Sequence, residues 1–170
     1  MILGMSLATF TMVHVIISLI AIVAGLVVMF GMLGSSPMSG LTAIFLLFTI
    51  LTSATGFVIP PLLFEKLLPS HLFGILSFIL LTIACIALYG MKLAGAWRWI
   101  YVATALASLY LNVFVLVVQS FLKVPALTAL APGNPPAGPV FGLVQGIVLV
   151  FFIIMGIGAI RRYRPVAAYA

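Results

Sequence analysis

Five long stretches with almost no charged residues dominate this sequence. An α-helix needs about 20 apolar residues to cross the hydrocarbon core of a bilayer. Runs of that length, bounded by prolines, glycines or basic residues, lie at residues 8–33, 41–60, 70–91, 97–122 and 140–160. Only 5% of the residues are charged, whereas soluble domains have about 25%, so this chain could not build a water-exposed surface. We therefore predict an all-α integral membrane protein in which residues 1–170 form a single bundle of five transmembrane helices.

Turn-forming residues separate the predicted helices. Gly34 to Pro37 is a turn cluster that ends the first helix, and Pro60 and Pro61 end the second, because proline lacks the backbone N–H that a continuing helix needs. Residues 123–139 hold five prolines and two glycines, which predicts an ordered loop without helix outside the membrane. Residues 1–11 contain no Lys or Arg, so we expect the first apolar run to remain as a helix and not to act as a cleaved signal peptide.

The basic residues predict the orientation of the bundle. Cytoplasmic loops of membrane proteins carry an excess of Lys and Arg. One predicted end has only Lys66 and Lys123, and the other end has five basic residues, which are Lys92, Arg98, Arg161, Arg162 and Arg164. We therefore expect the N-terminus outside and the C-terminus in the cytoplasm of a bacterial inner membrane. The net charge of +6 does not indicate a nucleic-acid partner, because these residues flank apolar runs next to lipid headgroups.

The inventory of reactive side chains excludes several classes of enzyme. Glu65 is the only acidic residue, so catalysis by paired carboxylates is impossible. Cys85 is the only cysteine, so the chain can form neither an internal disulfide nor a thiolate metal cluster. Phosphate-binding loops, metalloprotease motifs and nucleophile elbows are absent. The sequence thus gives no positive support for an enzyme.

Two histidines fall at the same predicted depth in the membrane. His14 lies 19 positions before Leu33, and His71 lies 20 positions before Met91, which puts both near the outer face at about 1.5 Å of rise per residue. Two such imidazoles could be the axial ligands of a b-type haem, or could bind a metal such as copper together with Met5 or Met12. The alternative is that both rings simply lie at the polar interface.

The five-helix layout resembles, in architecture, the small bundles of membrane b-type cytochromes. Dihaem cytochromes of that kind use four histidines, and this chain has two. The resemblance therefore implies at most one haem held by two histidines.

Amides in the fourth and fifth helices predict a polar pocket near the outer face. Ser108, Asn112 and Gln119 are spaced by four and seven residues, so they share one face of a helix. Gln145 lies near the outer start of the last helix, and we expect it to face the same pocket. Such amides could bind a cofactor, or they could form hydrogen bonds between helices.

Three functions are compatible with these features. We favour an accessory, structural or ligand-binding subunit with an outward-facing polar pocket. Such a subunit would contact the lipid bilayer and could have a protein partner in a membrane complex. The first alternative is an electron-transfer protein that binds haem b or a quinone through His14 and His71. The second is transport of a small solute, which is disfavoured because the inner half of the predicted bundle is almost entirely apolar.

Overall fold

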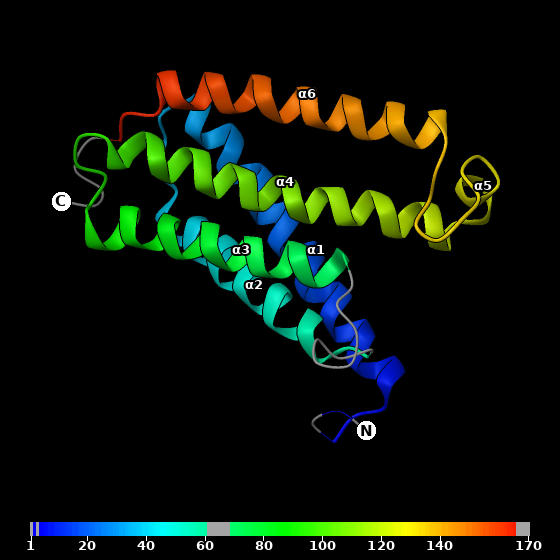
Figure 1. The fold of residues 1–170 in the computed structure, drawn as a ribbon. Helices are drawn as coiled ribbons and strands as arrows, with labels where there is room; N and C mark the ends of the chain where they lie inside the picture. The colour runs from blue at the N-terminus through cyan, green and yellow to red at the C-terminus, as the bar shows by residue number, and fades with distance from the viewer. Residues whose placement is uncertain (1, 3, 61–68, 166–170) are drawn as a thin grey trace.

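Five long helices form an antiparallel bundle in this computed structural model, which describes every residue except 1, 3, 61–68 and 166–170 (Figure 1). The long helices are α1 (Leu7–Leu33), α2 (Ser39–Val58), α3 (Pro69–Cys85), α4 (Trp97–Lys123) and α6 (Pro139–Arg162). The five predicted helices are confirmed, and each is long and apolar enough to cross a membrane. The chain is therefore a polytopic membrane protein.

Local sequence explains where the first two helices begin and end. Ser6 caps α1, because its side chain accepts a hydrogen bond of 3.1 Å from the backbone N–H of Thr9. Helix α2 ends at Val58, two residues earlier than predicted. Ile59 is extended, with φ −79° and ψ 122°, as expected for the residue that precedes Pro60.

The third helix changes character near its end. We predicted one continuous helix over residues 70–91, but the regular α-helix ends at Cys85 and a π-helical turn, η1 (Ile86–Gly90), follows. The N–H of Met91 closes this wider turn by donating to the carbonyl oxygen of Ile86 at 2.8 Å.

The proline-rich loop contains a short helix, and the prediction that residues 123–139 hold no helix was wrong. Helix α5 (Pro125–Thr128) starts with its proline at the first position, where the missing N–H would have had no partner in the helix. Gly138, with φ +111°, then turns the chain into α6, which begins with Pro139 in the same way.

The two ends of the bundle differ in chemistry. We call the end near His14 and His71 the histidine end and the opposite end, near Arg98 and Arg162, the arginine end. At the arginine end the Arg98 guanidinium donates from Nη1 to the carbonyl oxygens of Ile160 at 2.9 Å and Tyr163 at 2.7 Å. Residues Glu65 and Lys66, in the predicted connector between the second and third helices, lie outside the described residues.

Helix α4 occupies the centre of the bundle and contacts the other four long helices. In Figure 1, α4 and α6 run alongside each other, whereas α1 crosses behind them. The N-terminal half of α1 therefore diverges from α6 toward the histidine end.

The closely packed core lies in the arginine-end half of the bundle. Its fully buried side chains include Met29 on α1, Phe45 on α2, Leu88 on η1 and Tyr101 on α4. Gly25 shows how tight the packing is, because a Cβ there would come within 2.6 Å of Leu109 and 2.8 Å of Phe45. A solute path through the whole bundle would have to pass these side chains, so this half of the described structure gives no support to transport.

Candidate functional site

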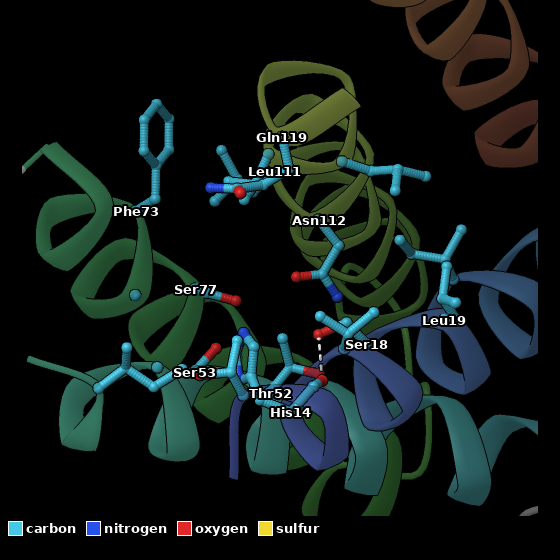
Figure 2. Close-up of a pocket in the computed structure, with 18 of the residues that line it drawn as sticks. His14, Ser18, Leu19, Thr52, Ser53, Phe73, Ser77, Leu111, Asn112 and Gln119 are labelled. Atoms are coloured by element: carbon cyan, nitrogen blue, oxygen red, sulfur yellow. Dashed lines mark hydrogen bonds between the residues drawn. The ribbon is translucent and has the colours of Figure 1, made fainter. Parts of the chain in front are cut away.

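A cavity of about 510 Å³ opens in the histidine-end half of the bundle, between α1, α2, α3 and α4 (Figure 2). This volume falls within the range of about 300–1,000 Å³ that small-molecule sites usually have. Its wall is mostly apolar, with a few polar side chains from each of the four helices. Four of the five predicted cofactor-binding residues line it, namely His14, His71, Asn112 and Gln119.

Gln145 is the predicted site residue that does not line this cavity. Its Nε2 donates to the carbonyl oxygen of Phe114 at 3.1 Å, so the amide joins α6 to α4. The described cavity is built from α1 to α4 without α6. Ser108 does not line the cavity either, and its hydroxyl donates back to the carbonyl oxygen of Thr104 at 2.9 Å.

The amide of Asn112 projects from α4 into the cavity, and Gln119 follows two turns later on the same face (Figure 2). Asn112 is partly buried, and its Nδ2 is covered from water yet finds no hydrogen-bond partner among the residues that the structure describes. The two ends of an amide exchange by a half-turn of the terminal group. Since no hydrogen bond from Nδ2 opposes this rotation, Asn112 can present either its carbonyl oxygen or its NH₂ group to the cavity.

Ser77 on α3 is a second buried polar group in the cavity wall, and sequence reasoning missed it. Its side chain is only 3% exposed, and its hydroxyl has no hydrogen-bond partner in the described structure. Other hydroxyls in these helices bond back to a carbonyl four residues earlier, as Thr82 does with Phe78 at 2.8 Å. Ser77 instead points into the same space as Asn112 (Figure 2). Six residues correspond to about one and two-thirds helical turns, so the spacing from His71 gave no signal for Ser77.

His14 is held by a hydrogen bond between α1 and α2. Its Nδ1 lies 2.6 Å from Oγ1 of Thr55, and this hydroxyl donates its own hydrogen to the carbonyl oxygen of Leu51 at 2.7 Å. Because a hydroxyl has only one hydrogen, both contacts are satisfied together in the tautomer in which His14 Nδ1 donates. In the neutral ring, Nε2 then carries the lone pair. Thr55 does not line the cavity, so the interaction leaves Nε2 as the nitrogen available to a ligand.

His71 forms part of an aromatic wall on α2 and α3. Its ring stacks on Phe57 with a centroid distance of 6.0 Å and an interplanar angle of 27°, and Phe57 stacks in turn on Phe78 at 5.8 Å. Gly74 makes room for this stack, because a Cβ there would come within 2.7 Å of the Phe57 ring. Phe57 and His71 therefore form an aromatic pair in the cavity wall.

A metal site made only of protein ligands has few candidates here. The described residues contain no group of three or more His, Cys, Asp or Glu side chains that could hold an ion. Neither Met5 nor Met12 lines the cavity beside the two histidines, and Met12 is 65% exposed. A metal ion held by His14 and His71 would therefore need further ligands from outside the described residues.

Lining side chains on α1 and α4 are partly exposed. Three lining side chains there, Val15, Leu19 and Leu116, are between 37% and 43% exposed on the apolar surface of the bundle. In a helix bundle that spans a membrane, such a surface contacts lipid tails. An opening between these side chains would face lipid tails, and Lys123 lies at the last position of α4.

No family model, no curated protein and no solved structure matches this chain. The fold and the cavity define a polytopic membrane protein with a site of small-molecule size at one end of its bundle.

Proposed function

We propose that this chain is a ligand-binding protein of the bacterial inner membrane, which holds a small lipid-soluble molecule in the cavity at its histidine end. The observation that carries this proposal is a mostly apolar cavity of 510 Å³ whose wall includes Ser77 and Asn112, two polar residues that each have a buried atom without a hydrogen-bond partner in the described structure. A buried polar group without a hydrogen bond costs about 1–3 kcal/mol. A bound molecule with polar atoms of its own would remove this cost once the Ser77 hydroxyl and the Asn112 amide rotate toward it.

The distribution of charge supports an outward-facing cavity. The basic residues Arg161, Arg162 and Arg164 follow each other at the arginine end, where Lys92 and Arg98 also lie. Lys123 is the only described basic residue at the histidine end. By the positive-inside rule the arginine end is cytoplasmic, so the cavity opens in the outer half of the membrane.

Filling the cavity tests this function. Native mass spectrometry of the purified protein, after incubation with a total lipid extract of the host membranes, is expected to show a bound small molecule. Val115→Phe adds volume to a residue that lines the cavity, so this variant should lose the bound mass. Val150→Phe is the matched control, because Val150 is 55% exposed on the lipid-facing side of α6. A wild-type protein that binds nothing, or equal binding by both variants, would contradict the proposal.

Haem b is the second candidate for the ligand, because both imidazoles line one cavity and the Thr55 interaction leaves His14 Nε2 available. A ligating histidine commonly donates its other ring N–H to a neighbouring group, which fixes the ring. Visible spectra of protein expressed with added haem, oxidised and dithionite-reduced, test this candidate. A sharp reduced band that is lost in both His14→Ala and His71→Ala would establish haem ligation, and a colourless wild-type protein would exclude it.

The role of accessory or structural subunit rests on the sequence alone. The described residues present no feature that points to a particular protein partner. Co-purification of a defined complex from native membranes would support this role, whatever the cavity holds.

A further inference from the structure

We infer that the ligand of this cavity is a quinone, which enters from the bilayer between α1 and α4 and seats its ring between Ser77, Asn112 and His14. This inference deepens the proposed function and rests on it, because it assigns a chemical class to the molecule in the same cavity. Four properties of the cavity define that class.

The first property is the route of access. Val15 and Leu19 on α1 and Leu116 on α4 line the cavity and are also exposed on the apolar surface of the bundle. A ligand that passes between them keeps its apolar part in contact with lipid tails and with these side chains. The ligand is therefore a molecule that partitions into the membrane, with a long apolar part and a smaller polar head.

The second property is the absence of formal charge among the described residues of the deep part of the cavity. Its polar side chains there, which include Ser53, Ser77 and Asn112, are neutral, and Lys123 lies at the last position of α4. A buried ionised headgroup would need an opposite charge beside it. A fatty-acid carboxylate or a phosphate group therefore does not fit the deep end, and an uncharged head does.

The third property is that the polar groups can serve both as donors and as acceptors. The Ser77 hydroxyl and the Asn112 amide each donate or accept after a simple rotation, and neither is held by a hydrogen bond to the described protein. In the tautomer in which Nδ1 donates to Thr55, the neutral His14 ring offers the Nε2 lone pair. Carbonyl oxygens of an oxidised quinone need donors, and hydroxyl groups of the reduced form need acceptors. This set of side chains satisfies both forms.

The fourth property is the pair of aromatic side chains, Phe57 and His71, in the cavity wall. Their rings are stacked with an interplanar angle of 27°, and both residues line the cavity. A planar ring packs on such a surface in an offset arrangement, which is favourable by about 0.5–1.5 kcal/mol beyond area burial. An uncharged, planar, lipid-soluble head with two oxygen substituents is the chemistry of a quinone.

Calorimetric titration with a short-chain benzoquinone, which carries one isoprene unit, tests this assignment on the full chain in detergent micelles. The wild-type protein is expected to bind the quinone with one site per chain. Asn112→Leu and Ser77→Ala each remove one hydrogen bond and should weaken binding by about threefold to tenfold. Ser108→Ala is the matched control on α4, because its hydroxyl is buried and bonds to Thr104 outside the cavity.

A second titration separates hydrogen bonding from simple partitioning into micelles. The dimethyl ether of the corresponding quinol keeps the ring and the tail but has neither carbonyl nor hydroxyl groups. It should bind wild-type protein at least about tenfold more weakly than the quinone does, since two hydrogen bonds are weakened. Equal affinity for the ether and the quinone, or equal quinone affinity of Asn112→Leu and Ser108→Ala, would overturn the inference.

The two proposals fail in different ways. If mass spectrometry finds a molecule that Val115→Phe loses, but the quinone does not bind, the cavity is a ligand site and the quinone assignment is wrong. If the cavity holds no molecule and binds no quinone, the proposed function fails as well. The variants should keep the thermal stability of the wild-type protein within a few degrees, so that lost binding is not lost folding.

Discussion

His14 Nδ1 lies 2.6 Å from Oγ1 of Thr55, and this short hydrogen bond fixes the orientation of the imidazole in the cavity wall. The contact joins residues 41 positions apart on two antiparallel helices. Because Thr55 already donates to Leu51, the interaction also determines which ring nitrogen remains for a ligand. One hydroxyl therefore couples the packing of α1 on α2 to the chemistry of the candidate site.

Thr55→Val tests the structural part of this relationship. Valine keeps the branched shape of threonine but cannot accept from His14, so unfolding should become easier by about 0.5–1.5 kcal/mol. Thr52→Val is the control, because its hydroxyl bonds only to Phe48 within α2. Reversible unfolding in mixed micelles, followed by circular dichroism, measures the difference. Equal effects of the two substitutions would show that the contact with His14 contributes nothing.

The helices could be predicted from the sequence because each one corresponds to a continuous apolar run of residues. An uncharged run of about 20 residues marks each span, and prolines and glycines mark its ends. The predicted ends of α4 and α6 therefore lie within two residues of the observed ones. The same counting placed His14 and His71 at one end of the bundle, where both line one cavity.

The rest of the site could not be predicted, because sequence periodicity does not tell how one helix is rotated against another. Gln145 was expected to share a pocket with Asn112, yet it faces the other side of α4 and bonds to Phe114. Ser77 was missed because a lone serine in an apolar run usually bonds to its own helix. The π-turn after Cys85 depends on hydrogen bonds that leave no mark in the sequence.

Gly25→Ala is expected to be the most damaging small substitution in the arginine-end half. Its Cβ would lie 2.8 Å from the Phe45 ring, so the core must shift, at a cost of about 1–3 kcal/mol. Gly156→Ala is the control, because a Cβ there meets nothing within 4 Å. The thermal unfolding midpoint of both variants in one detergent provides the comparison. A Gly25→Ala protein as stable as Gly156→Ala would mean that the core is looser than described.

Arg98→Met should release the C-terminal end of α6. The Arg98 guanidinium donates to two carbonyl oxygens there, those of Ile160 and Tyr163. A hydrogen bond from a charged group contributes about 1.5–3 kcal/mol when it is buried, and less when it is partly exposed. Limited proteolysis should therefore cleave the C-terminal segment faster than in the wild type. Arg161→Met removes the same charge from an exposed position and should leave the rate unchanged. Equal rates for the two variants would exclude a clamping role for Arg98.

The orientation of the bundle decides which compartment the histidine end faces, and two exposed alanines can report it. Ala137 lies in the loop before α6 at the histidine end, and Ala94 lies in the loop before α4 at the arginine end. In a Cys85→Ser background, a membrane-impermeant maleimide should label Ala137→Cys in intact spheroplasts and label Ala94→Cys only after lysis, because the arginine end carries the cytoplasmic excess of positive charge. The reverse pattern would place the cavity in the cytoplasmic half of the membrane. The ligand would then have to be sought among molecules of the inner leaflet, although the hydrogen-bonding argument for its class would be unchanged.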